Sequence, residues 1–480
     1  MIIKFISKDF MRFLPETLAR ICNMTVDAER KPELMNQLAL KHCVWKHCAL
    51  KQWLVVCSML GVLTGCDSGE KVDVNDSGSN AKVVEDDRDR QADLLQNQTV
   101  DVAKPFDEQE EISRAMQLSK EGRHQEAAQR LQQVLLANPS NVEVLFRLAL
   151  TQAELGDFDS AVELLDSIPE DSEAGLAAIG QSADWCLMLG KYDQAEKRYR
   201  RVLNLVPSAI VAHRQLAFLY NRQGRRHEAV VHLKELCRLG DIRQDELHAL
   251  LVVGHAIFED PNNPDPSDAP RHYWPIGPVA EARMLYTANR YSDAIAALDE
   301  TVRDGDVLPS VMAFYGLLAI EAQDEPRFQW WLANCDQAVE GFSEYWAAIG
   351  ASLVGKREFD QAVYALLRAI DLDPTDLASM RRVNQSLQAL NRDEEAERWV
   401  DRYVTQRSAT LASNAIGEAT EVDPSDFETV ADNLEKLGRP LEAVTWRVFG
   451  AFYRKESEQR LTELNQIRRD LASAENAFPD

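Results

Sequence analysis

The sequence predicts an all-α protein, a superhelical solenoid of about eight or nine helix–turn–helix repeats. Glycines recur at a constant interval of 34 residues, at Gly122, Gly156, Gly190 and Gly224. Alanines keep the same interval, at Ala127, Ala161, Ala195 and Ala229. Apolar residues between them recur at spacings of three and four, which places them on one face of a helix.

The unit around Gly190 illustrates how each element follows from its residues. Apolar side chains at helical spacing predict one helix over 183–189 and a second over 195–205. Gly190 lies between them, where a left-handed residue is needed that glycine supplies without steric cost. Ala195 is small because two antiparallel helices approach closely there. Pro207 ends the second helix because it has no N–H group to donate.

The same pattern divides most of the chain into repeat units. The first set comprises 108–141, 142–175, 178–207 and 210–243. The second set comprises 275–308, 309–342, 343–376, 377–410 and 424–457. The unit over 309–342 is degenerate: it keeps Gly316, but Phe328 stands where the alanine is expected. The clearest unit, 343–376, carries Trp346, Gly350, Phe359, Ala362, Ala369 and Pro374.

This pattern of tryptophan, glycine, alanine and proline resembles the tetratricopeptide repeat (TPR) family over about 108–457. The resemblance implies a scaffold that binds protein or peptide partners, without catalysis and without a cofactor. A generic helical bundle with accidental spacing is the alternative interpretation. Accidental spacing would not keep the same repeat phase over so many units.

The N-terminal region has the features of an export signal. Lys41, Lys46 and Lys51 precede a short apolar run over 53–63. The run ends in Leu-Thr-Gly-Cys at Cys66, which resembles the bacterial lipobox and implies a diacylglycerol on that cysteine. A buried apolar helix with a chance cysteine is the alternative. Residues 1–34 make the leader overlong, and our hypothesis is that translation begins at Met35.

The composition changes along the chain predict its domain organisation. Residues 1–65 are the leader and signal peptide, and the polar, acidic stretch 66–107 is a disordered tether. A first array with one extra helix, over 245–258, occupies 108–258, and a proline-rich linker loop follows over 259–274. The second array spans 275–457, and 458–480 is a capping helix and tail. Asp67 slightly favours retention in the inner membrane.

The charge balance excludes one class of partner. The net charge is −25, whereas nucleic-acid binding needs a basic surface. The acidity serves either solubility or a basic partner.

Enzyme signatures are missing from the sequence: we find no phosphate loop, nucleophile elbow, zinc helix or dinucleotide fingerprint, and predict neither catalytic nor metal-binding residues. The histidines, His227, His232, His248 and His255 among them, are interpreted as packing or surface residues. Cys186, Cys237 and Cys335 are interpreted as free cysteines. A calcium site and an unfamiliar enzyme site, with Asp265 and His272, remain minor alternatives for the loop over 259–278.

A binding surface is expected on the first helix of each unit, which lines the concave face in the TPR family. The predicted peptide-binding groove consists of Arg214, Gln215, Phe218, Asn221, Arg222, Arg381 and Arg382. Arg283, Tyr286 and Phe314 are expected on the same face. Arginines fit a carboxylate bidentately, although the family's lysine and asparagine carboxylate clamp is not reproduced. Alternatively, these arginines pair with acids of the next unit.

Together these features predict a scaffold anchored by lipid to a membrane of the bacterial cell envelope, facing the periplasm or the exterior. Its partners would be proteins or peptides, and it could form a homo-oligomer. The competing hypothesis is a docking or oligomerisation stalk of a larger envelope system that combines TPR arrays with a β-propeller.

Overall fold

The computed structural model describes residues 106–255, 275–303, 305, 307–418 and 422–477. All regular secondary structure in these residues is helical, which confirms the predicted all-α solenoid class. The leader, Cys66, the tether and the loop over 259–274 lie outside the described residues. None of the helices that are described is long and apolar enough to cross a bilayer.

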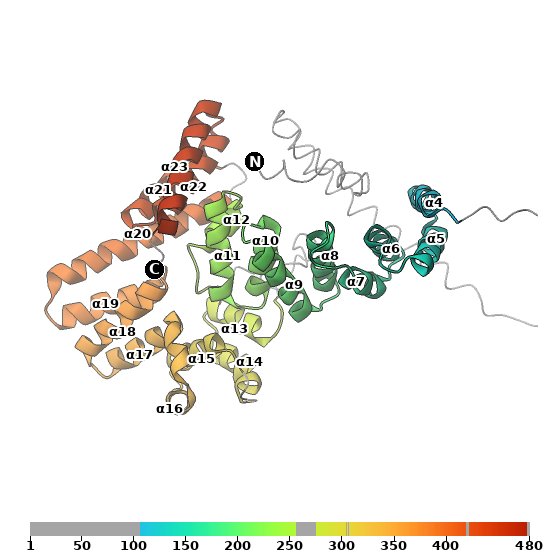
Figure 1. Cartoon of the computed structure of the whole chain (residues 1–480). Coiled ribbons are helices and arrows are strands. Elements are labelled where there is room, and N and C mark those ends of the chain that lie inside the picture. The colour runs from blue at the N-terminus through green and yellow to red at the C-terminus, as the bar shows by residue number, and fades with distance from the viewer. Residues whose placement is uncertain (1–105, 256–274, 304, 306, 419–421, 478–480) are drawn as a thin grey trace, which may run out of the picture. The chain divides into compact units, whose positions relative to one another are not determined.

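The described helices form nine consecutive antiparallel pairs (Figure 1). The first set consists of α4 (Glu108–Lys120), α5 (His124–Ala137), α6 (Val142–Glu154), α7 (Phe158–Asp166), α8 (Gly175–Met188), α9 (Tyr192–Leu205), α10 (Ile210–Arg222) and α11 (Arg226–Leu239), followed by the single short α12 (Gln244–Ala249). The second set consists of α13 (Pro278–Thr287), α14 (Tyr291–Arg303), α15 (Pro309–Glu321), α16 (Glu325–Asn334), the 3₁₀-helix η4 (Gln337–Gly341), α17 (Ser343–Gly355), α18 (Phe359–Leu372), α19 (Leu377–Ala389), α20 (Asp393–Glu418), α21 (Pro424–Lys436) and α22 (Pro440–Tyr453), followed by α23 (Glu458–Ala477).

The turn inside each pair contains a left-handed residue, as the glycines predict. In the first set these are the four periodic glycines, with φ of 73° to 85°. In the second set four residues that are not glycine take the same conformation, at Asn289, Gln323, Arg357 and Asn391, with φ of 58° to 61°. These positions also recur every 34 residues, so the second set keeps the 34-residue period although the glycines are lost.

The periodic alanines lie where the helices of a pair touch. Each of the four in the first set is 0 % exposed. In the degenerate unit, Phe328 takes this position and is also fully buried, beside Trp331 at a ring distance of 5.3 Å. Gly316 on the partner helix compensates for the larger residues, because a Cβ there would lie 2.2 Å from Trp331. The next pair has a glycine at the same position of its first helix, Gly350, so the degenerate pair keeps the small residue of its first helix and lacks that of its second.

The helix predicted over 245–258 is wrong over 250–255, because α12 ends at Ala249 and turns begin there, and residues 256–258 lie outside the described part of the chain. A helix continues only if its own N–H groups satisfy its carbonyl groups. Here the N–H donor is a side chain from far along the chain: Gln406 Nε2 donates to the carbonyl oxygen of Leu251 at 3.0 Å. The substitute hydrogen bond lets the segment leave the helix without an unsatisfied buried carbonyl.

The unit predicted over 377–410 is longer than expected, because α20 continues to Glu418. The additional turns bury Ala412 and Ile416 in a core shared with α11, α12, α21 and α22.

The last helices return to the first array. Both α22 and α23 pack against α11, and we call this contact the closing interface. Arg468 of α23 donates to the carbonyl oxygens of Cys237 (3.3 Å) and Arg238 (3.0 Å) at the end of α11. A cation is favourable at a helix C-terminus, where carbonyl groups are left without helical partners. Gly240 makes room, because a Cβ there would lie 2.1 Å from the guanidinium.

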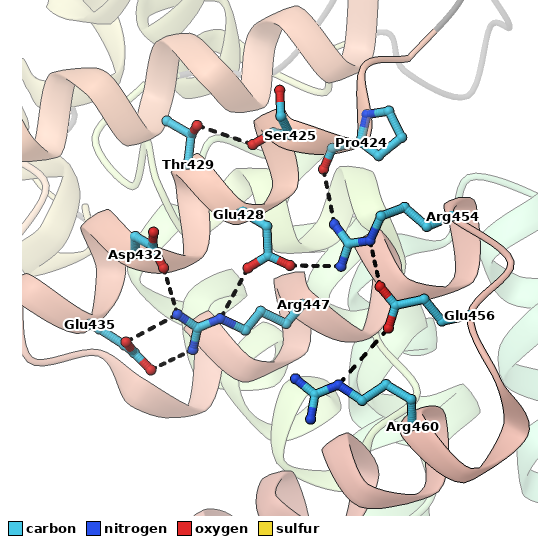
Figure 2. A network of polar contacts seen from close by, with 10 residues as sticks. All are labelled: Pro424, Ser425, Glu428, Thr429, Asp432, Glu435, Arg447, Arg454, Glu456 and Arg460. Carbon is cyan, nitrogen blue, oxygen red and sulfur yellow. Dashed lines mark hydrogen bonds and ion pairs between the residues drawn. The ribbon is translucent and has the colours of Figure 1, made fainter.

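A network of surface ion pairs joins α21 to α22 (Figure 2). Arg447 of α22 lies between Glu428 (3.3 Å), Asp432 (2.7 Å) and Glu435 (2.5 Å) of α21. Exposed pairs of this kind contribute roughly 0–1 kcal/mol each. The network therefore orients two helices whose stability comes from the apolar core beneath them.

Candidate functional site

A cavity of about 720 Å³ lies in the second array, on the side formed by the first helices of its pairs. Its walls come from α13, α15, α17 and α19, and it is completed by α20 and by residues at 248–255. Small-molecule and cofactor sites typically have volumes of about 300–1,000 Å³. Arg283, Tyr286 and Phe314, which the sequence predicts on the concave face, all line it.

Glu344 is the centre of a buried charge cluster in the wall. It is 5 % exposed, and its carboxylate accepts from Arg283 Nη2 at 2.9 Å and from His227 Nε2 at 2.6 Å. Ser343 donates to it at 3.1 Å. Burial alone raises the pKa of a carboxyl group, but the charges of His227 and Arg283 outweigh burial and hold the pKa of Glu344 well below its usual value.

Arg283 links three separate parts of the chain, and each of its three nitrogens already donates to a protein atom. Its Nε donates to the carbonyl oxygen of Gly224 at 2.6 Å, and its Nη1 donates to that of Gly254 at 3.2 Å. Its Cζ lies 4.1 Å from the ring centre of Phe314, a cation–π distance. With the Glu344 ion pair, these contacts give Arg283 a structural role in joining α13 to the α10–α11 turn.

Arg226 is a second buried guanidinium next to this cluster. It is 0 % exposed and donates to the carbonyl oxygens of Val253 (3.0 Å) and Ala249 (3.2 Å) and to the side chain of Asn221. Burial, and then the nearby charge of Arg283, lowers the pKa of Arg226 to about 9. The arginine thus organises the non-helical segment after α12, which forms one edge of the cavity.

Two aspartates enter the cavity from the turn between α18 and α19. Asp373 is 4 % exposed, and its Oδ1 accepts from the backbone N–H (2.8 Å) and the hydroxyl (2.6 Å) of Thr375. Burial, and then the nearby carboxylate of Asp376, raises the pKa of Asp373. Asp376 caps the N-terminus of α19 by accepting from Ser379, through its N–H at 2.9 Å and its hydroxyl at 2.5 Å.

Aromatic and histidine side chains form the remaining polar wall. Tyr286 contacts His255 edge-to-face at 6.2 Å and Phe314 at 5.6 Å between ring centres. Burial raises the pKa of Tyr286, so its phenol stays protonated. Burial also lowers the pKa values of His248 and His255, so both rings are neutral near pH 7.

The predicted groove residues of α10 do not line this cavity. Arg214 forms ion pairs with Glu246 (2.7 Å) and Asp241 (2.8 Å), as the alternative interpretation of pairing with acids of the next unit expected. Arg222 lies over the ring of Phe218 at 5.4 Å. Gln215 is half-buried on the same helix, and Asn221 is buried and accepts from Arg226.

The two second-array residues of the predicted groove, Arg381 and Arg382, lie in different environments. Arg382 lines the cavity and forms an ion pair with Glu321 at 2.5 Å, whereas Arg381 is exposed outside it. The sequence reasoning missed Glu344, Asp373 and Asp376. The only signal for the aspartates was their position beside Pro374, at the turn that ends the clearest repeat unit.

Within the described part of the chain, no group of three metal-ligating side chains could hold an ion. His232, paired with His213 at 2.9 Å, has its pKa lowered to about 4 by burial and by that neighbour. Cys186, Cys237 and Cys335 form no disulfide bond among the described residues; the first two are buried and the third is half-buried.

The family comparison matches one part of the chain. Residues 118–177 match the model of the tetratricopeptide repeat. No curated protein sequence matches the chain significantly.

Solved structures similar to this chain include repeat proteins at low sequence identity. A tetratricopeptide repeat protein from Parabacteroides merdae is 11 % identical, with a TM-score of 0.27, covering 58 % of this chain and 98 % of its own. The Cut9–Hcn1 hetero-tetramer of APC/C is 12 % identical, with a TM-score of 0.26, covering 73 % of this chain and 74 % of its own. The TPR2AB domain of yeast Sti1 in complex with pHSP90 is 12 % identical, with a TM-score of 0.21, covering 62 % of this chain and 98 % of its own.

Proposed function

We propose that this chain is a non-catalytic scaffold that binds a segment of a partner protein in the cavity of its second array. The observation that carries the proposal is the cavity itself, which four consecutive first helices line with polar and aromatic side chains. The match of residues 118–177 to the tetratricopeptide repeat supports it, because arrays of this kind present surfaces to other proteins.

The roles of the charged residues favour binding over catalysis. Glu344, Arg283 and His227 satisfy one another, and Arg382 is matched by Glu321. General acid–base catalysis needs a group that is free to exchange a proton with a substrate. These paired charges instead hold repeats together around the cavity.

A filled cavity tests the binding proposal. Ala378 of α19 lines the cavity, and Ala378→Trp places an indole in it. Gln388→Trp, at an exposed position of the same helix, is the matched control. Full-length chains carrying each change would be used for affinity capture from solubilised membranes of the native host.

We expect Ala378→Trp to lower the amount of specifically bound protein at least about tenfold, and Gln388→Trp to leave it unchanged, because most binding energy lies in the central contacts of an interface. Equal capture by both variants would contradict a partner site in this cavity.

We further propose that the scaffold is lipid-anchored at the bacterial cell envelope through Cys66. This part rests on the apolar run and the Leu-Thr-Gly-Cys sequence that ends at Cys66, which lie outside the described residues. Intact mass of the mature protein from membranes should give an N-terminus at Cys66 carrying acyl chains. Cys66→Ala should release the protein from membranes, and a native product without fatty acids would contradict the anchor.

A further inference from the structure

We infer that His213 and His232 form an acid-sensitive joint, which holds α10 to α11 near neutral pH and loosens this pair of helices in mild acid. The inference goes beyond the proposed function and does not depend on it, because neither histidine lines the cavity. His213 lies on α10 and is 7 % exposed, whereas His232 lies on α11 and is half-buried. Their Nδ1 atoms are 2.9 Å apart, so one ring donates a hydrogen bond to the other.

The neighbours of the two rings assign their protons. His213 Nε2 lies 2.8 Å from the carbonyl oxygen of Pro207, which can only accept, so this nitrogen carries a proton. His213 Nδ1 is therefore the acceptor of a neutral ring, and His232 Nδ1 is the donor. A further proton on His213 Nδ1 would set two N–H groups against each other. A further proton on His232 goes to Nε2 and makes that ring a cation.

The groups around His232 do not compensate for such a cation. Titratable side chains reach it from three helices: Arg200 and Glu196 of α9, His213 and Tyr220 of α10, and Glu235 of α11. Both carboxylates already pair with arginines, since Glu196 lies 2.6 Å from Arg225 and Glu235 is paired with Arg238. The pair of histidines is therefore built for the neutral state of both rings.

The direction of the pH effect follows from His232. Burial, then the neighbouring His213, and then Arg200 lower the pKa of His232 to about 4. When the joint loosens, the ring meets water and its pKa returns to about 6.5. The loosened state then binds more protons between these two values. The stability of the joint is complete above about pH 6.5 and is lost as the pH falls toward about 4.

The joint is connected to the cavity through α11. His227, at the start of this helix, pairs with Glu344 of the cavity wall at 2.6 Å. Burial lowers the pKa of His227, but the charge of Glu344 outweighs burial and raises it. Acid therefore strengthens the contact of α11 with the cavity wall while it weakens the contact of α11 with α10.

Amide hydrogen exchange, read by mass spectrometry, tests the joint in the full-length chain. The opening equilibrium of peptides from α10 and α11 is compared at about pH 7.5 and about pH 5, after correction for intrinsic exchange rates. The test variant is His232→Gln, whose amide can donate to His213 and carries no charge at either pH. We expect opening to rise about thirtyfold more in the native chain than in His232→Gln, as pKa values of about 4 and about 6.5 require.

His124→Gln is the matched control, because His124 begins α5 in another pair of helices. It should show the same rise in opening of α10 and α11 as the native chain. Equal rises in the native chain and in His232→Gln would overturn the inference.

A second measurement needs no variant and decides the case if His232→Gln does not fold. Exchange of the hydrogen on Cε1 of each imidazole, followed by mass spectrometry, gives the pKa of His232 in the native chain. We expect a midpoint below about 5.5, and a midpoint above that value would contradict the joint.

Discussion

At the scale of single residues, the cavity wall depends on buried charges that satisfy one another. Glu344, Arg283 and His227 come from three different elements, and each would be costly to bury alone. The sequence predicted Arg283 for the concave face because it lies on the first helix of a unit. It could not predict the role of Glu344, since its partner His227 lies 117 residues away and no local pattern links them.

Replacement of Glu344 tests this cluster. Glu344→Gln leaves two buried cations without a counter-charge, and we expect the free energy of unfolding to fall by about 3 kcal/mol or more. Glu435→Gln removes a carboxylate of similar chemistry that is 51 % exposed, and should cost no more than about 1 kcal/mol. Urea titrations followed by circular dichroism measure both. Equal losses of unfolding free energy in the two variants would show that burial does not determine how much the ion pair contributes to stability.

The same cluster predicts a pH dependence. Burial lowers the pKa of His227, but the attraction of Glu344 outweighs it, so its pKa lies above the ordinary 6.5. A raised folded-state pKa means that the contribution to stability is complete below the unfolded-state pKa and is lost as pH rises through the folded-state value. The difference in unfolding free energy between the native chain and His227→Gln should therefore shrink from about pH 6 to about pH 9. A difference that grows over this range would contradict the assignment.

At the scale of elements, each helix pair needs one small residue where its helices touch. The alanine period identifies this residue in most units, and the sequence therefore predicted the pairs well. In the degenerate unit the small residue is Gly316, which faces Trp331. Gly316 lies 34 residues before Gly350 and so keeps the period, whereas its contact with Trp331 depends on how two residues fit each other and cannot be predicted from spacing.

Two glycine substitutions measure this fit. Gly316→Ala places a Cβ 2.2 Å from Trp331, and we expect a loss of about 1–3 kcal/mol from overpacking. Gly180→Ala in α8 meets nothing within 4 Å and should stabilise the chain by up to about 1 kcal/mol, because alanine favours helix over glycine. Thermal unfolding of both variants should shift in opposite directions. Stabilisation by Gly316→Ala would contradict the close contact described here.

At the scale of the whole described array, the sequence could predict the repeats but not where the last ones pack. A 34-residue period is local information, whereas the closing interface joins α11 to helices more than 200 residues later. Another long-range contact accompanies the end of α12 at Ala249, because Gln406 of α20 donates to the carbonyl oxygen of Leu251. The edge of the cavity at 248–255 depends on such long-range packing and was invisible for the same reason.

The closing interface shares its core with residues 247–251, and residues 248–255 form one edge of the cavity, so the cavity and the proposed function depend on this interface. Cys237 of α11 and Thr445 of α22 meet there, with 3.4 Å between Sγ and Oγ1. In the Thr445→Cys variant, mild oxidation should form an intramolecular disulfide to Cys237, detected by mass spectrometry of the linked peptides. Thr429→Cys, on the exposed side of α21, should not link to Cys237. Formation of the disulfide by most of the Thr445→Cys protein is the predicted result, and its absence under conditions that oxidise exposed thiols would contradict the account.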